Sequence, residues 1–155
     1  MAFAKYLATS LWLEMKHIKK TSPLTILCDG DLGAGKTHFI KQVIKEWLGD
    51  DKISITSPTF SLVNIYEKNG IKILHGDFYR LENTHEAVEL NLDDYALTHH
   101  FLLEWADKAK DYLPQDDLQI TLRAKFHTPT DEGRDITLVA HGDFYKKFLT
   151  QFSYP

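Results

Sequence analysis

The chain has little of several features that would place it in a particular class of protein. Its 155 residues include one cysteine, Cys28, so no disulfide can form within the chain, and we expect Cys28 to be a small buried apolar residue. No stretch approaches the roughly 18 apolar residues that are needed to span a bilayer. The first residues also lack the basic segment and long apolar run of a signal peptide. We therefore expect a cytoplasmic protein without membrane association.

The chain also has a small excess of acidic residues and few arginines, and both bear on function. The net charge is −4, which gives no support for direct nucleic-acid binding through a basic face. Arginine occurs only at Arg80, Arg123 and Arg134, whereas nucleotide kinases use several arginines to clamp two substrates and a transferring phosphoryl group. The Asn-Lys-x-Asp motif, with which GTPases read guanine, is absent. The missing guanine motif favours ATP over GTP by elimination, and the small number of arginines argues against a nucleotide kinase.

The most informative segment that is present covers residues 30–37, Gly-Asp-Leu-Gly-Ala-Gly-Lys-Thr, and completes the pattern G-x-x-x-x-G-K-[ST]. Glycines let such a loop wind so that its amide N–H groups point into one concavity that suits a polyphosphate. Lys36 can then reach the phosphates of ATP, and the Thr37 hydroxyl can bind Mg²⁺. The predicted nucleotide-binding residues are Asp31, Leu32, Gly33, Ala34, Gly35, Lys36, Thr37 and His38.

The surroundings of this loop support a phosphate-binding function over a simple glycine-rich turn. Residues 24–28 read as a short buried strand directly before it. Apolar residues at helical spacing follow it from Phe39 to Leu48, and Gly49 is a suitable stop for that helix. A strand, a glycine-rich loop and a helix in this order are the arrangement that a phosphate-binding loop needs.

The rest of the chain predicts an α/β fold: a single three-layer domain over residues 1–155, similar to P-loop NTPases, with a mixed parallel and antiparallel sheet. Asn69-Gly70 lies between two apolar runs and indicates a hairpin. Asn83 is expected to cap a helix together with Glu86, and His99-His100 to lie on a helix or loop surface without binding a metal. Helices are expected over 7–18, 84–91 and 143–152, and strands over 53–56, 62–66, 71–75, 101–103, 118–124 and 136–140, the last two paired across a polar loop at 125–134.

Three further polar residues follow predicted strands and could complete a site with the loop. Glu104 closes the apolar strand 101–103, where a carboxylate that holds or orients Mg²⁺ belongs, and Asp77 follows another strand. Thr59, in a turn after Pro58, could sense the γ-phosphate through Mg²⁺. Catalytic roles are predicted for Lys36, Asp77 and Glu104, and metal contacts for Thr37, Thr59, Asp77 and Glu104; which of the two acids binds Mg²⁺ directly stays open.

The order and spacing of four segments resemble those of the TsaE (YjeE) family of small bacterial ATPases. The segments are 30–37, Ser57-Pro58-Thr59-Phe60, 75–81 and Glu104-Trp105. The resemblance spans roughly residues 5–150. It implies an ATP- and Mg²⁺-dependent role in forming threonylcarbamoyladenosine at position 37 of tRNA, together with a TsaB–TsaD pair, so that tRNA is met through that complex. The resemblance also aligns Trp105 with the tryptophan that follows the acidic residue, here Glu104, in the family.

The chain departs from the family pattern at two places. His38 stands where the family often has a second Thr or Ser, and Ala106-Asp107 replaces Pro-Glu after Glu104-Trp105. The leading hypothesis is a slow ATPase that a partner activates. Two other functions remain open from the sequence: a small-molecule P-loop kinase, and a binding module that responds to nucleotide without hydrolysing it.

Overall fold

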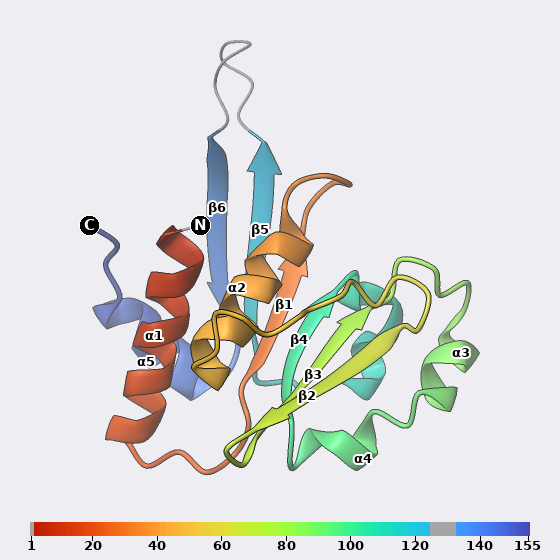
Figure 1. Ribbon diagram of the computed structural model, residues 1–155, viewed down its shortest axis with the longest axis horizontal. Coiled ribbons are helices and arrows are strands. Elements are labelled where there is room, and N and C mark those ends of the chain that lie inside the picture. The colour runs from red at the N-terminus through yellow and green to blue at the C-terminus, as the bar shows by residue number, and fades with distance from the viewer. Residues whose placement is uncertain (1, 125–132) are drawn as a thin grey trace.

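A computed structural model describes residues 2–124 and 133–155 and shows a mixed six-stranded sheet covered by helices (Figure 1). The strands lie in the order β2-β3-β4-β1-β5-β6. The four inner strands run parallel, and the edge strands β2 and β6 pair antiparallel with their neighbours. The elements in chain order are α1 (Ala2–His17), β1 (Thr25–Asp29), α2 (Lys36–Leu48), β2 (Val63–Lys68), β3 (Ile71–Asp77), α3 (Thr84–Glu89), α4 (Asp93–Ala96), β4 (His100–Glu104), the 3₁₀ helix η1 (Ala106–Tyr112), β5 (Leu118–Ala124), β6 (Arg134–Ala140) and α5 (Asp143–Gln151).

Two apolar clusters, one on each face of the sheet, make the three layers. Side chains of a strand alternate between faces, so Ile26 and Cys28 pack with α1, α2 and α5, whereas Leu27 packs with α3 and η1. Neighbouring β4 repeats the alternation, with Leu102 on the first face and Leu103 on the second. The predicted α/β class with a mixed sheet is confirmed, and Cys28 is fully buried as expected.

Local sequence signals account for several boundaries. Asn69 and Gly70 adopt φ values of 52° and 78° between β2 and β3, as a hairpin of the predicted type requires. The Asn83 side chain accepts a hydrogen bond from the Glu86 backbone N–H at 3.1 Å and so caps α3. Gly49, with φ of 61°, ends α2 at the predicted position.

The predicted strand over residues 53–56 is wrong. The structure describes these residues as an irregular segment, and side chains of β2 bond the backbone of Thr56 in place of a strand partner. The Thr56 N–H donates to the Tyr66 hydroxyl at 3.2 Å, and the Thr56 carbonyl accepts from Asn64 at 3.3 Å. Ile55 is nevertheless buried in the core, which explains the apolar signal. The predicted loop 125–134 lies outside the described residues except at its last two positions.

The expectation that His100 lies on the surface is also wrong. His100 opens β4 and is 8% exposed, and its Nδ1 accepts a hydrogen bond of 2.9 Å from the Leu24 backbone N–H. Its ring lies 5.6 and 5.2 Å from the rings of Trp12 and Trp47. Burial, with smaller contributions from His99 and Lys20, lowers the pKa of His100 to about 4.

We expect His100 to make the fold sensitive to mild acid. Because its pKa is about 4 in the folded chain and about 6.5 when unfolded, the unfolded chain binds the extra proton between these pH values. The free energy of unfolding is therefore unaffected by His100 above pH 6.5. It falls as the pH drops toward 4, by about 3 kcal/mol at most. Denaturant unfolding from pH 7.5 to 4.5 checks this. His100→Asn, which keeps an acceptor, should flatten the pH dependence, and an equal slope in both proteins would contradict the assignment.

Among the described residues, no helix is long and apolar enough to cross a membrane.

Candidate functional site

A pocket of about 440 Å³ opens where β1, β3 and β4 end at one edge of the sheet. Parallel neighbours place their carboxyl ends together, and the register sets Asp77 of β3 directly beside Glu104 of β4. The loop after β1 forms another wall. The residues that line the pocket are Leu32, Gly33, Gly35, Lys36, Thr37, His38, Ser57, Thr59, Asp77, Tyr79, Arg80, Glu104 and Trp105.

The loop over residues 30–35 has a conformation that only glycine fits at two points. Gly30 has φ of 133°, and a Cβ there would lie 2.2 Å from the Leu122 carbonyl oxygen. Gly35 has φ of 104° and precedes the first turn of α2, whose backbone N–H groups have no partner within the helix. The loop therefore presents a helix N-terminus to the pocket, which favours an anion. Of the predicted nucleotide-binding residues, Asp31 and Ala34 do not line the pocket: the Asp31 carbonyl accepts a hydrogen bond from Lys36, and Ala34 is buried.

Lys36 is held within the loop. It is 4% exposed, and its Nζ donates to the carbonyl oxygens of Gly30 and Asp31 at 2.6 and 2.8 Å. The same ammonium lies 4.4 Å from the centroid of the Trp105 ring, within cation–π range. Three contacts thus fix a positive charge at the base of the pocket, where the sequence placed the phosphate-binding lysine.

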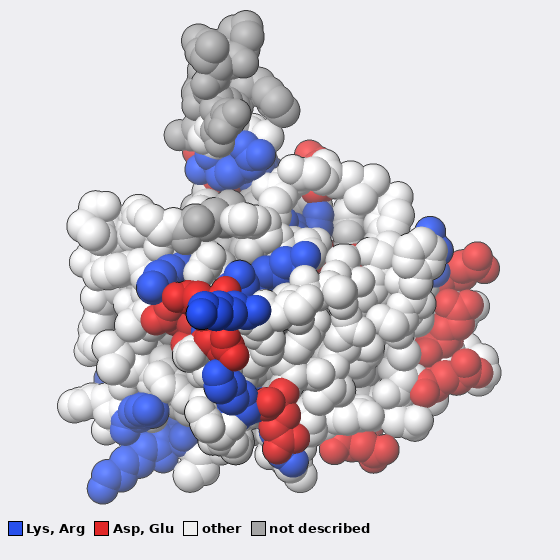
Figure 2. All heavy atoms as spheres, viewed as in Figure 1, with Lys and Arg blue, Asp and Glu red and all other residues white. Residues whose placement is uncertain are grey.

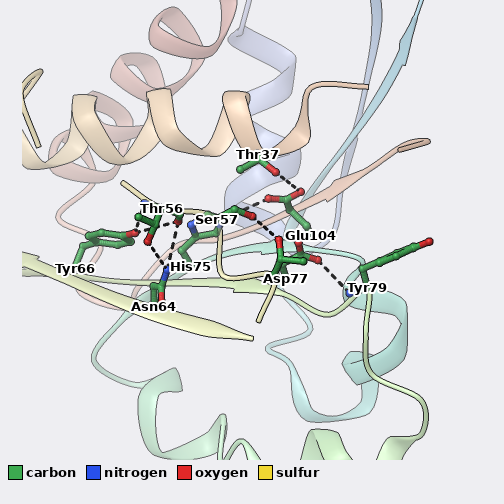
Figure 3. Close-up of polar contacts among 10 residues, drawn as sticks. Thr37, Thr56, Ser57, Asn64, Tyr66, His75, Asp77, Tyr79 and Glu104 are labelled. Carbon is green, nitrogen blue, oxygen red and sulfur yellow. Dashed lines mark hydrogen bonds and ion pairs between the residues drawn. The ribbon is translucent and has the colours of Figure 1, made fainter. Parts of the chain in front are cut away.

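Thr37 and Glu104 are directly linked. The Thr37 hydroxyl, one residue into α2, donates a 2.9 Å hydrogen bond to Oε2 of Glu104, as Figure 3 shows. Glu104 is 3% exposed at the end of β4. The sequence predicted both residues as metal contacts from separate segments, and the fold brings their oxygen atoms together.

Asp77 lies at the end of β3 beside Glu104 and is 7% exposed. Its Oδ1 accepts a hydrogen bond from the Tyr79 backbone N–H at 3.1 Å. Burial is the main cause that raises the pKa of Asp77, and the neighbouring Glu104 carboxylate raises it further. Two carboxylates at one strand edge are more easily kept charged when a cation lies between them, which suits a metal-binding role.

Thr59 also lines the pocket, although it comes from an irregular segment. Its hydroxyl lies 2.8 Å from the Ser57 hydroxyl, across the buried Pro58. Beyond it, Phe60 is 83% exposed, and the Arg80 guanidinium lies 4.3 Å from the centre of its ring. The structure thus places Thr59 at the same pocket as Thr37, Asp77 and Glu104.

Trp105 forms one side of the mouth. It has φ of 55°, a left-handed conformation that is uncommon for a bulky residue, between β4 and η1. Its ring lies 5.0 Å from the ring of Tyr79 and covers the Lys36 ammonium. Backbone strain of this kind often accompanies a functional site.

Sequence reasoning missed two residues next to this site. Arg134 of β6 donates from Nε to the Ala34 carbonyl at 3.1 Å and so holds the loop from a strand 100 residues away. His75 of β3 is fully buried, and its Nε2 lies 3.4 Å from Oε1 of Glu104. The sequence signals for His75 were its place two residues before Asp77 and at the start of segment 75–81, and neither indicated its contact with Glu104. Arg134 gave none, because its contact depends on the pairing of β5 with β6.

The donor set fits Mg²⁺ that arrives with a nucleotide better than a metal held by protein alone. No group of three or more His, Cys, Asp or Glu that could hold an ion occurs in residues 2–124 and 133–155. Mg²⁺ in nucleotide sites commonly takes one or two carboxylates, phosphate oxygens and waters. The Thr37 hydroxyl and the carboxylates of Asp77 and Glu104 can supply such a share, and Thr59 lies at the same pocket.

Comparisons with known proteins agree with this architecture. The family described as "Threonylcarbamoyl adenosine biosynthesis protein TsaE" matches residues 2–136. Similar proteins include the tRNA threonylcarbamoyladenosine biosynthesis proteins TsaE of Rickettsia bellii, 38% identical over 63% of this chain and 67% of that protein, and of Bacillus subtilis, 37% identical over 81% and 75%. The crystal structure of Bacillus subtilis YdiB matches with a TM-score of 0.69 and 29% identity, covering 97% of this chain and 86% of YdiB. The chain therefore belongs to the TsaE family of tRNA threonylcarbamoyladenosine biosynthesis proteins.

Proposed function

We propose that this protein, as a single P-loop domain over residues 1–155, binds ATP with Mg²⁺ and hydrolyses it slowly. In this proposal it works in the cytoplasm as an accessory to TsaB- and TsaD-like proteins that modify position 37 of tRNA. The observation that carries the ATPase proposal is the hydrogen bond between the Thr37 hydroxyl and the Glu104 carboxylate in a pocket that also contains the glycine-rich loop. Membership of the TsaE family supports the role in tRNA modification.

Each part of the site has a distinct task in this proposal. Lys36 and the backbone N–H groups at the start of α2 bind the phosphates. Thr37, Asp77 and Glu104 contribute oxygen atoms toward Mg²⁺, which supplies positive charge against the phosphate oxygens when it is bound. Glu104 also orients the water that attacks the terminal phosphate. Thr59 responds to the γ-phosphate and passes that state to the exposed Phe60.

Slow turnover in the absence of partners follows from the shortage of positive charge. Arg80 is the only arginine among the described residues that line the pocket, and its guanidinium is stacked on Phe60. Phosphoryl transfer gains much of its rate from groups that stabilise the charge of the transition state. A partner that adds such a group, or that moves Arg80, would raise the rate. The same shortage argues against a small-molecule kinase.

The surface charges support contact with tRNA through partners. On the face drawn in Figure 2, acidic side chains gather along the right-hand edge, over α3, and at the lower edge, over α4, and the centre mixes both signs. The first turns of these two helices contain Glu86, Asp93 and Asp94. A nucleic-acid surface normally carries an extended basic patch. On this face the Lys and Arg side chains instead lie in separate groups, among them the mixed centre and the lower left corner.

We expect ATP with Mg²⁺ to stabilise the fold. A ligand at 100 times its Kd adds about 2.7 kcal/mol of stability, which for a chain of this size raises the Tm by roughly 5–10 °C. Differential scanning calorimetry with ATP, with Mg²⁺ and with both checks this, and GTP serves as the control for base preference. An unchanged Tm at millimolar ATP and Mg²⁺ would count against the proposed nucleotide site.

A further inference from the structure

His75 is a buried histidine whose position the proposed function has not used. It lies on β3, its side chain is 0% exposed, and its Nε2 is 3.4 Å from Oε1 of Glu104. The other oxygen of Glu104, Oε2, accepts the hydrogen bond from Thr37. Both oxygens of this carboxylate are therefore contacted by side chains from different elements, β3 and α2, as Figure 3 shows.

The contact with Glu104 assigns a hydrogen to Nε2 of His75. A carboxylate oxygen accepts hydrogen bonds, so Nε2 is the donor in this contact, and in the Nε2–H tautomer Nδ1 is a bare acceptor. In the part of the chain that the structure describes, buried Nδ1 has no hydrogen-bond partner. Leaving a buried acceptor without a partner costs about 1–3 kcal/mol. A leucine or methionine would avoid that cost, so packing alone gives no reason for histidine here.

We propose that His75 is a positioning residue for Glu104: its Nε2–H holds Oε1, so that Oε2 stays directed at the Thr37 hydroxyl. This inference rests on the proposed ATPase function for its consequence, and on the contacts alone for its geometry. The last torsion of a glutamate side chain is broad, and a carboxylate held at one oxygen can swing. Held at both oxygens, Glu104 is already oriented before nucleotide binds, which is how supporting residues assist a site.

Two substitutions at His75 separate the hydrogen bond from the volume of the side chain. His75→Met keeps an apolar side chain of similar length and removes the donor, whereas His75→Gln can place an amide N–H near the position of Nε2. We expect His75→Met to lower kcat by about 10- to 100-fold and to raise the Mg²⁺ concentration that ATP binding requires. The KM for ATP should change by less than about threefold, because Lys36 and the loop are untouched. His75→Gln should recover most of the loss.

A double-mutant cycle tests whether His75 acts through Glu104. If it does, His75→Met should have little further effect on kcat or on the Mg²⁺ requirement in the Glu104→Gln background. If His75 were purely structural, His75→Met would lower kcat and raise the Mg²⁺ requirement by the same factors in either background. Thermal unfolding of each variant accompanies the kinetics. His75→Met removes the unpaired Nδ1 but also leaves Oε1 of Glu104 without its donor, so the kinetic comparison is made below the Tm of every variant.

The geometry can be tested without ATP. In ¹⁵N-histidine NMR spectra, the imidazole that disappears in His75→Gln should show one protonated nitrogen, Nε2, and one bare nitrogen, Nδ1. Glu104→Ala should release this preference and give a mixture of tautomers. A wild-type chain that shows the tautomer but binds no ATP would contradict the proposed function and leave the positioning intact. An Nδ1–H tautomer in the wild type, or equal effects of His75→Met in both backgrounds, would overturn the inference.

Discussion

Replacing Glu104 by glutamine is expected to lower ATP turnover by about 100-fold or more while ATP with Mg²⁺ still binds. The amide keeps the size of the side chain and can still accept the hydrogen bond from Thr37, but it lacks the negative charge that orients water and supports Mg²⁺. Nucleotide affinity depends mainly on Lys36 and the loop, so it should fall much less than kcat. Steady-state phosphate release and calorimetric ATP binding measure the two effects separately.

Asp107→Asn is the matched control for this experiment. Asp107 is an exposed acid on η1, only three residues after Glu104, so its replacement removes the same charge from the same region. We expect it to leave turnover near the wild-type rate. If Glu104→Gln hydrolyses ATP as fast as the Asp107→Asn control, Glu104 has no catalytic role.

Lys36→Ala is expected to weaken ATP binding by at least about tenfold. A charged hydrogen bond is worth about 1.5–3 kcal/mol, and Lys36 is the cation that the structure fixes within the phosphate-binding loop. The substitution also removes the donor to the carbonyls of Gly30 and Asp31 and the contact with the Trp105 ring. Part of the loss should therefore appear as a lower Tm in the absence of nucleotide. Calorimetric titration with ATP and with ADP measures the affinity.

Lys108→Ala separates the loss of phosphate binding from the loss of these backbone contacts. The Lys108 ammonium also donates to two carbonyls, those of Tyr79 and Leu81, at 2.6 and 2.8 Å, and lies 5.7 Å from the centroid of an aromatic ring. It has nearly the same contacts as Lys36 but lies outside the glycine-rich loop. The Lys108→Ala substitution should lower the Tm while ATP affinity stays near that of the wild type. Equal losses of affinity in both variants would contradict a specific role for Lys36.

The parts of the fold that could be predicted from sequence are those whose signals are local. The glycine-rich loop and its helix, the Asn69-Gly70 hairpin and the Asn83 cap each depend on a few neighbouring residues, and each is confirmed. The meeting of Asp77 with Glu104 could also be anticipated, because acids at the ends of parallel neighbours share one edge of a sheet.

The errors and omissions depend on contacts between distant segments. Residues 53–56 have the composition of a strand, but Asn64 and Tyr66 satisfy their backbone from β2. The sequence predicts His100 at the surface, but in the fold the Leu24 N–H and two tryptophan rings surround it. For the same reason no local pattern could reveal that His75 touches Glu104.

The central claim is that this chain uses ATP hydrolysis to support threonylcarbamoyladenosine formation. Its most direct test is repeated turnover of tRNA modification in a reconstituted reaction with TsaB- and TsaD-like partners, comparing wild type with Glu104→Gln at saturating ATP and Mg²⁺. We predict sustained modification with the wild type, and at most a single round with the variant, which still binds ATP. Full, sustained modification by a Glu104→Gln protein that does not hydrolyse ATP would contradict the claim and would identify the chain as a nucleotide-dependent binding module.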